Sequence, residues 1–245
     1  MANSNSLSEK VSLIVLVWNE IEALPKIWDS IPFGLADEVF FMDPGSNDGT
    51  VEFIKNKGFP VYIQKKTGRG NAFVEGMNIA KFENLIFFSG DGNENPEDIP
   101  RIISYLKEGY DMVIAGRHIL PGAKSDNSDD FLLLRKYVPV LFGLFINLVW
   151  KTHVKDPVNG FRGFKKASMK RMMLDAPKHE IELQSTIRAG KLKMKIKEFP
   201  TVELLRAGGK RKPTAGSFTL GFLFIYYILR EIWIGISFEK NEREK

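Results

Sequence analysis

A pair of oxygen-bearing side chains, Asp91 and Asn93, follows an apolar run of the chain. Carboxylate and amide oxygens are the ligands that Mg²⁺ and Mn²⁺ prefer, and the chain has no cysteine to favour a softer metal. Two such groups are too few to enclose an ion, so a metal bound here would be shared with phosphate oxygens of a ligand. An isolated Asp-x-Asn is also typical of a solvated turn, so the surrounding elements must decide between the two interpretations.

The elements around this pair place it at the edge of a sheet. Residues 84–88 form a short apolar run, typical of a strand buried on both faces, and Gly90 and Gly92 let the backbone turn after it. Asn95 is a favourable N-cap, so we expect a helix over 99–108. The pair would then lie at the carboxyl end of a central strand, where open α/β sheets bind ligands.

The preceding part of the chain repeats this arrangement. Apolar runs at 11–17, 38–42 and 61–64 alternate with helical segments at 22–30, 50–57 and 72–80. This alternation predicts an α/β fold with a mostly parallel central sheet flanked by helices. Polar or glycine-rich loops follow each strand, and three of them beside an Asp-x-Asn indicate a nucleotide pocket. Asp43 would accept hydrogen bonds from a base or ribose, while Arg69 and the amides near Gly70 suit phosphate.

The order of these motifs resembles a known enzyme family. The motifs are Val-Trp-Asn-Glu at 17–20, Asp-Pro-Gly-Ser-Asn-Asp-Gly-Thr at 43–50, Gly-Arg-Gly-Asn-Ala at 68–72 and Asp-Gly-Asn-Glu-Asn-Pro-Glu-Asp-Ile-Pro at 91–100. Together they resemble family 2 glycosyltransferases with the Rossmann-like GT-A fold. Motifs at 113–117, 155–164 and 179–184 narrow the resemblance to the dolichyl-phosphate mannosyltransferase, or polyprenyl-phosphate glycosyltransferase, branch. The resemblance covers about residues 10–215.

The resemblance and the loop positions together give the candidate site residues. Those for the nucleotide-diphosphate sugar are Val17, Asn19, Glu20, Asp43, Ser46, Arg69, Gly70, Asn71, Gly90, Asp91, Arg206 and Lys210, and those for the metal are Asp91 and Asn93. Arg206 and Lys210 are included because cations would stabilise a departing diphosphate; the alternative is a solvated or lipid-facing basic loop. Arg117 and Arg135 match positions that bind the acceptor phosphate in the resembled family.

Two departures from the family pattern concern the donor. The family's Asp-x-Asp motif has an aspartate where this chain has Ser89, and Asn93 replaces a glutamine. Metal binding is therefore expected to be weaker or differently arranged. Trp18 and Pro44 also replace family residues near the base pocket, so the nucleobase is not fixed by the resemblance.

The acceptor decides which groups catalysis needs. A polyprenyl phosphate oxygen is already anionic, so it needs cations rather than a base, and inversion by single displacement is expected. A sugar hydroxyl would need a carboxylate base, for which Asp156 and Glu182 are candidates. Both also have structural interpretations, as a turn residue and as the partner of a basic side chain. The candidate catalytic residues are therefore Asp91, Arg117, Asp156 and Glu182.

Composition fits one catalytic domain with a hydrophobic appendage. The 245 residues can fill a single α/β core, and the net charge of +5 fits anionic substrates or an anionic membrane surface better than nucleic acid. The absence of cysteine excludes disulfides, and we expect no secretory signal, because the sequence does not open on a basic segment followed by an apolar one. We expect a disordered tail at 1–9, a GT-A domain at 10–215, a membrane-associating helix at 216–238 and a charged tail at 239–245.

Two apolar segments bear on the membrane. Residues 131–150 contain Pro139 and Gly143, which should break or kink a helix, and a charged pair interrupts 218–238. A spanning helix needs about 20 uninterrupted apolar residues, which neither segment supplies. Interfacial helices on the cytoplasmic face fit better, since the basic residues 210–212 precede the second segment. The alternative is a pair of core or dimer-contact helices.

Three functions remain open from the sequence. The first is a metal-dependent inverting glycosyltransferase that moves a hexose from GDP-mannose or a UDP-sugar to polyprenyl (dolichyl) phosphate. The second is a GT-A enzyme acting on a hydroxyl of a glycan or lipid. The third is a degenerate nucleotide-sugar-binding protein, suggested by Ser89. The sequence leaves the oligomeric state open.

Overall fold

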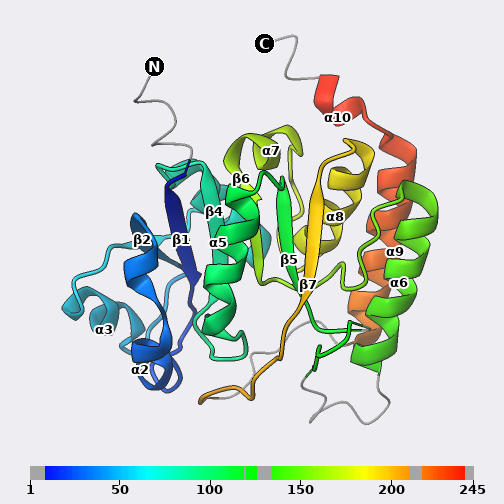
Figure 1. Ribbon diagram of the computed structural model, residues 1–245. Helices are drawn as coiled ribbons and strands as arrows, with labels where there is room; N and C mark the ends of the chain where they lie inside the picture. The colour runs from blue at the N-terminus through cyan, green and yellow to red at the C-terminus, as the bar shows by residue number, and fades with distance from the viewer. Residues whose placement is uncertain (1–8, 119, 126–133, 210–216, 241–245) are drawn as a thin grey trace, which may run out of the picture.

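The computed structural model describes residues 9–118, 120–125, 134–209 and 217–240. A seven-stranded sheet in the order β3-β2-β1-β4-β6-β5-β7 lies between two layers of helices (Figure 1). The strands are β1 (Val11–Leu16), β2 (Glu38–Asp43), β3 (Val61–Ile63), β4 (Asn84–Ser89), β5 (Met112–Gly116), β6 (Arg162–Lys165) and β7 (Ile196–Pro200). The expected α/β architecture is thus confirmed.

The strand directions bring one additional loop to the expected binding edge. β1 is parallel to β2 and β4, β2 to β3, and β5 to β7. Only β6 is antiparallel to its neighbours, β4 and β5. Its amino end therefore lies at the carboxyl edge of those two strands, and Arg162 pairs with Phe87 there. The loop that precedes β6 consequently joins the loops that follow β4 and β5.

The two faces of the sheet bury different helices. Residues alternate along β4, so Phe87 belongs to one core and Phe88 to the other. The helices on the Phe88 face include α2 (Leu24–Ile27), α3 (Thr50–Asn56) and α5 (Ile99–Lys107). Those on the Phe87 face are α4 (Arg69–Ile79), α6 (Leu134–Trp150), α7 (Lys166–Arg171), α8 (Glu180–Lys191) and α9 (Ser217–Ile234). Short helices η1 (Trp28–Ser30), η2 (Phe33–Leu35), η3 (Pro96–Asp98) and α10 (Ser237–Lys240) complete the chain.

Pro139 does not break α6, contrary to the expectation from sequence. The helix runs through Pro139 over the described residues Leu134–Trp150, and the missing amide of Pro139 costs it one hydrogen bond. Gly143 has a packing role instead, because a Cβ there would lie 3.0 Å from the carbonyl oxygen of Lys155. α6 therefore continues as one helix and packs closely on the loop that follows it.

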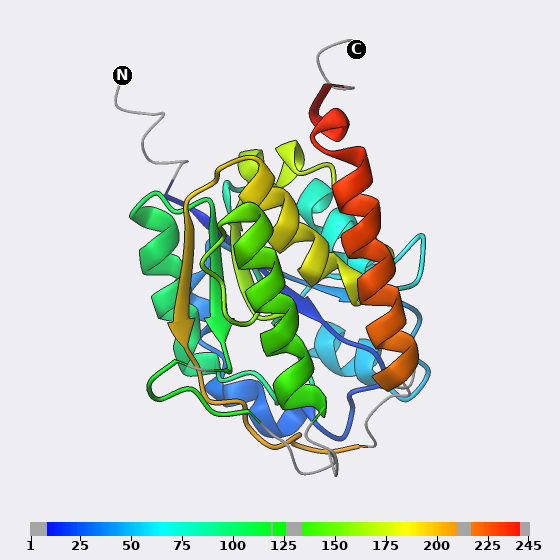
Figure 2. The same ribbon diagram turned by 90° about the vertical axis from the view of Figure 1, so that its right-hand side faces the viewer.

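The C-terminal helix α9 lies beside α6 and against α8 (Figure 2). Its residues Phe224, Tyr227 and Ile228 are buried in the core of the Phe87 face. One face of α9 is thus buried in the core, while its other face is exposed. In the part of the chain that the structure describes, no helix is both long and apolar enough to cross a membrane.

Candidate active site

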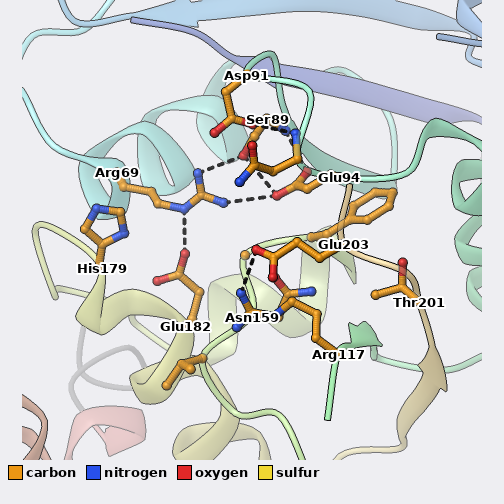
Figure 3. Close-up of a pocket in the computed structure, with 14 residues that line it drawn as sticks. Arg69, Ser89, Asp91, Glu94, Arg117, Asn159, His179, Glu182, Thr201 and Glu203 are labelled. Atoms are coloured by element: carbon orange, nitrogen blue, oxygen red, sulfur yellow. Dashed lines mark hydrogen bonds and ion pairs between the residues drawn. The ribbon is translucent and has the colours of Figure 1, made fainter. Parts of the chain in front are cut away.

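A pocket of about 170 Å³ opens at the carboxyl edge of the sheet. Its lining comes from six segments of the chain (Figure 3). In chain order, the lining residues are Arg69; Ser89, Asp91, Asn93 and Glu94; Arg117; Val158, Asn159, Gly160 and Phe161; His179 and Glu182; and Thr201 and Glu203. The predicted residues Arg69, Asp91, Asn93, Arg117 and Glu182 therefore meet in one site.

Asp91 and Asn93 lie together in the loop that follows β4. The Asn93 amide donates to Asp91 Oδ1 at 3.1 Å, which fixes the carboxylate. Asn93 Oδ1 is buried and has no hydrogen-bond partner among the described residues. The same part of the chain holds no group of three or more His, Cys, Asp or Glu side chains that could hold a metal ion. These groups fit a cation shared with a ligand, because an acceptor is left over and the protein offers no closed cage.

Glu94 is a pocket residue that the sequence analysis missed. Its carboxylate accepts hydrogen bonds from the Ser89 amide at 2.7 Å and from Ser89 Oγ at 2.9 Å. A second carboxylate therefore stands beside Ser89, where the family pattern has an aspartate. Burial raises the pKa of Glu94 to about 7. The charge of Asp91 contributes to this rise in pKa, whereas the charge of Arg69 opposes it. In the sequence, Glu94 is indistinguishable from an ordinary polar residue of a turn.

Arg69 crosses the pocket and is fixed at both ends. Its Nε donates to Glu182 Oε1 at 2.6 Å, and its Nη1 donates to Ser89 Oγ at 3.1 Å. Its Nη2 lies 3.6 Å from Glu94 Oε1. Although burial opposes it, the charges of Glu182 and Glu94 raise the pKa of Arg69. The guanidinium is therefore a permanent cation held in the pocket.

Gly70 and Asn71, at the start of α4, face a neighbouring loop. A Cβ at Gly70 would lie 1.9 Å from the carbonyl oxygen of Ala176, so only glycine permits this approach. The backbone amide of Asn71 donates to the carbonyl oxygen of Pro177 at 3.2 Å. The Asn71 side chain donates to the carbonyl oxygen of Thr67. The structure thus uses both residues for packing, and the Asn71 amide is occupied.

The loops after β1 and β2 bind each other. The Asn19 amide donates to Ser46 Oγ at 2.7 Å, and Asn19 itself has a left-handed backbone with φ of 50°. Asp43 is fully buried, and its oxygens accept from the amides of Gly45 and Ser46 and from Ser46 Oγ. Asp43 therefore shapes its own loop, and the expectation that it binds a base or ribose stays a prediction. None of these residues lines the pocket.

Arg206 joins the first strand loop to the metal-site loop. Its guanidinium forms ion pairs with Glu20 and, at 3.2 Å, with Asp91 Oδ2. The next residue is also fixed, since the Ala207 amide donates to the Asp91 carbonyl oxygen. Arg206 thus lies beside Asp91, whereas Lys210, the other basic residue expected to act on the diphosphate, lies outside the described residues.

Val17 and Gly90 are also in contact beside this loop. A Cβ at position 90 would lie 2.7 Å from Val17 Cγ1, so the turn after β4 packs on the end of the first strand only because residue 90 is glycine.

Arg117 occupies the opposite side of the pocket from Asp91 (Figure 3). Its Nε donates to Asp156 Oδ2 at 2.9 Å, and its Nη1 to Glu203 Oε1 at 3.3 Å. Asp156 is fully buried, whereas the Arg117 side chain is 20% exposed. Although burial acts in the opposite direction, Arg117 holds the pKa of Asp156 below its usual value. Asp156 therefore fixes the guanidinium of Arg117, while the side chain of Arg135 lies outside the described part of the chain.

Arg162 is a second residue that sequence reasoning missed. It is fully buried and donates to the carbonyl oxygens of Pro157 and Glu182 and to the hydroxyls of Ser185 and Thr186. Burial lowers its pKa to about 10. Arg162 thereby ties the pocket loop 157–160 to the start of α8. The residue type did not indicate its burial, because an arginine at the start of a strand is usually exposed.

Comparisons with known proteins agree with this geometry. The undecaprenyl-phosphate mannosyltransferase of Micrococcus luteus is 25% identical over 223 residues, which are 84% of this chain and 88% of that protein. The dolichol-phosphate mannosyltransferase of Pyrococcus furiosus is 29% identical over 211 residues, which cover 83% of this chain and 59% of that protein. Distant relatives of the chain are thus polyprenyl-phosphate and dolichol-phosphate mannosyltransferases.

The fold is shared with solved structures. Glucosyl-3-phosphoglycerate synthase from Mycobacterium tuberculosis, solved with Mn²⁺, UDP and glucosyl-3-phosphoglycerate, superimposes with a TM-score of 0.67. The alignment covers 90% of this chain and 79% of that one at 19% identity, which confirms the predicted GT-A fold. The family model described as glycosyl transferase family 2 matches residues 12–173, well over half of the sequence. The chain therefore belongs to glycosyl transferase family 2.

Proposed function

We propose that this enzyme transfers a hexose from GDP-mannose or a UDP-sugar to polyprenyl (dolichyl) phosphate at a membrane surface. The observation that carries the proposal is the pairing of Arg117 with Asp156. The carboxylate that would serve as a base is fully buried behind the guanidinium, so the partly exposed Arg117, and not Asp156, faces the acceptor on this wall. A cation suits an acceptor that is already anionic, and a phosphate oxygen needs no base.

The opposite wall suits the leaving diphosphate. Asp91 and the unpaired Asn93 Oδ1 would hold Mg²⁺ or Mn²⁺ together with phosphate oxygens, and Glu94 adds a second carboxylate nearby. The cation, when bound, neutralises charge that develops on the diphosphate. Arg206, fixed on Asp91 Oδ2, adds a positive side chain to the same wall. Breakage of the sugar-diphosphate bond would then occur beside the bound cation, which supplies the positive charge that this wall of carboxylates lacks on its own.

The two walls define the path of the reaction. The transferred sugar lies between Asp91 and Arg117, because the leaving and attacking oxygens must stand on opposite sides of the reacting carbon. Arg117 holds the acceptor phosphate, whose oxygen attacks with inversion. Asp156 and Glu203 restrain Arg117 in this position, since they bind separate nitrogens of its guanidinium. The proton balance is simple, because no proton leaves the acceptor.

A hydroxyl acceptor is the second candidate, and one observation favours it. Glu182 Oε2 is buried in the pocket lining and has no hydrogen-bond partner in the described part of the chain. A carboxylate oxygen in that state is able to take a proton from an attacking hydroxyl. Loss of transfer in a Glu182→Gln variant with intact donor binding, combined with activity toward a sugar or lipid alcohol, would favour this candidate.

A membrane partner is supported by the outer faces of α6 and α9. The two helices lie side by side (Figure 2). Each has a continuous exposed apolar stripe, formed by Tyr137, Leu141, Leu144, Phe145 and Leu148 on α6 and by Phe222, Ile225, Tyr226, Leu229 and Trp233 on α9. Apolar surface of this extent is typical of a protein or membrane interaction site, and a lipid-linked acceptor favours the membrane. The basic residues 210–212 favour its anionic cytoplasmic leaflet.

Sugar transfer in detergent tests the proposal. Labelled GDP-mannose, UDP-glucose and UDP-N-acetylglucosamine would each be incubated with a short polyprenyl phosphate and either Mg²⁺ or Mn²⁺. We expect one donor to yield a labelled lipid, and an Asp91→Ala variant to yield none. Donor binding without transfer to the lipid phosphate, but with transfer to an alcohol, would replace this proposal with the hydroxyl candidate.

A further inference from the structure

Glu182 carries an unused hydrogen-bond acceptor inside the pocket. The residue is only 2% exposed, and its Oε1 accepts from Arg69 Nε at 2.6 Å. Its Oε2 is buried and accepts no hydrogen bond from the described residues. Buried polar atoms are almost always satisfied in folded proteins, so an unsatisfied carboxylate oxygen at a pocket wall indicates a missing donor.

The carboxylate is held from two sides. Arg69 binds its Oε1, and the buried Arg162 donates to the Glu182 carbonyl oxygen at 2.9 Å. Glu182 also lies in the first turn of α8, which Arg162 fixes through Ser185 and Thr186 as well. The free oxygen therefore has a defined position before any ligand arrives, and little conformational entropy is lost when it binds a donor.

Charge identifies the missing donor. Glu182 is an ion-paired carboxylate, so a diphosphate or an acceptor phosphate would be repelled by it. A nucleobase is an unsuitable candidate as well, because the loops after β1 and β2 are absent from the lining of this pocket. Among the groups of the proposed ligands, the transferred hexose remains, since it must lie between Asp91 and Arg117 and carries hydroxyl groups along that path. A hydroxyl donor to a carboxylate forms a strong, charge-assisted hydrogen bond.

We propose that Glu182 Oε2 accepts a hydrogen bond from a hydroxyl group of the transferred sugar and thereby determines which hexose the enzyme takes. This inference rests on the proposed nucleotide-sugar substrate. In this inference Glu182 selects the donor sugar and does not take a proton from the acceptor. Arg69 acts through Glu182 in this scheme, as a positioning residue that also faces the diphosphate side.

Calorimetric binding separates the sugar from the nucleotide. The wild-type enzyme and Glu182→Gln would be titrated with the donor found in the transfer assay and with its nucleoside diphosphate alone, both with Mn²⁺. We expect the variant to bind the sugar nucleotide roughly tenfold to a hundredfold more weakly. Its affinity for the nucleoside diphosphate should stay within about twofold of the wild type, since that ligand carries no hexose hydroxyl for Oε2 to bind.

Deoxy analogues of the donor sugar identify the hydroxyl. One analogue should lose affinity for the wild type while it binds Glu182→Gln no worse than the parent donor does. Glu94→Gln is the matched control, because it also removes a carboxylate partner of Arg69 but leaves Glu182 in place. This control should keep the wild-type penalty for that analogue. Equal penalties in the wild type and Glu182→Gln for every analogue would overturn the inference.

Other outcomes are equally distinct. If the wild type binds none of the three sugar nucleotides, the proposed function itself fails. If Glu182→Gln binds donor normally and loses only transfer, Glu182 is a base and the inference is wrong. Far-ultraviolet circular dichroism checks folding, and Glu182→Asp provides a second variant that retains the charge but withdraws the oxygen from the sugar. We expect Glu182→Asp to show the same loss of sugar affinity.

Discussion

At the scale of single residues, Gly160 controls the position of Arg69. A Cβ at position 160 would lie 1.8 Å from Arg69 Nη2 and 2.7 Å from its Cζ, so the guanidinium lies directly on the glycine. We predict that Gly160→Ala displaces Arg69 from Glu182 and lowers the rate of sugar transfer by at least about tenfold, the loss expected when a bound charge is misplaced. Single-turnover transfer with saturating acceptor would measure the effect.

Gly34→Ala is the control for this prediction. A Cβ at Gly34 would have no atom within 4 Å, and no left-handed backbone is required there. This variant should therefore keep the wild-type rate. Full activity in Gly160→Ala would show that the contact with Arg69 has no role in the reaction.

Glu198 makes the free energy of unfolding depend on pH. It accepts the amides of Lys155 and Asp156, and burial raises its pKa to about 7 from an ordinary value of 4.5. The folded chain therefore keeps a proton that the unfolded chain loses between about pH 4.5 and 7. The stabilisation from this group is fully present below about pH 4.5 and is lost as the pH rises to about 7. The loss is at most about 3 kcal/mol.

We predict that Glu198→Gln has a flatter stability profile over this range, because it has no proton to lose. Urea unfolding of the variant and the wild type at pH 5 and pH 8 would measure the difference. The glutamine has one carboxylate oxygen fewer to accept the amides of Lys155 and Asp156, which weakens that loop at both pH values. The quantity to compare is therefore the change in unfolding free energy between pH 5 and pH 8. Two parallel profiles would contradict the assignment.

At the scale of elements, a buried charge cluster joins α9 to α8. Glu231 is fully buried on α9 and forms ion pairs with Arg188 at 2.9 Å and Lys191 at 2.5 Å, both on α8. Removal of one partner from a buried pair leaves an uncompensated charge, which costs about 3–5 kcal/mol. We predict a loss of this size in the unfolding free energy of Glu231→Gln, measured by urea unfolding.

The half-exposed pair of Arg171 and Glu239 provides the comparison. Glu239→Gln should cost less than about 1 kcal/mol, since exposed ion pairs contribute little. Similar losses in the two variants would mean that the α8 and α9 cluster does not hold the C-terminal helix in place.

Elements with a strong local pattern were predictable from the sequence. The apolar runs that became β1, β2 and β4 and the capped turn at Asn95 depend on neighbouring residues, and so the edge that carries Asp91 could be placed. The antiparallel β6 was not foreseen, because its direction is set by strands distant in sequence. Arg162 and Glu94 were missed for the same reason, since their burial depends on long-range packing.

At the scale of the whole molecule, α6 and α9 are apolar on both their buried and their exposed faces. Ile146 and Phe224 lie in the core, while Leu148 is 79% exposed and Trp233 is 87% exposed. A helix that is apolar all round needs an apolar partner on its second face. A membrane surface would bring the enzyme to a lipid-linked acceptor, and burial of each such side chain stabilises binding by about 1.5–3 kcal/mol.

We therefore predict that Leu148→Glu combined with Trp233→Glu weakens binding to vesicles of phosphatidylglycerol and phosphatidylcholine by at least about a hundredfold. Vesicle sedimentation measures the binding. Leu35→Glu is the control, because Leu35 is 51% exposed but lies in η2, next to the core of the opposite sheet face. Nucleotide-sugar binding should be unchanged in both variants, since the pocket residues are not altered. If the double variant binds vesicles as the wild type does, the two stripes contact a protein, and the acceptor lipid reaches the pocket by another route.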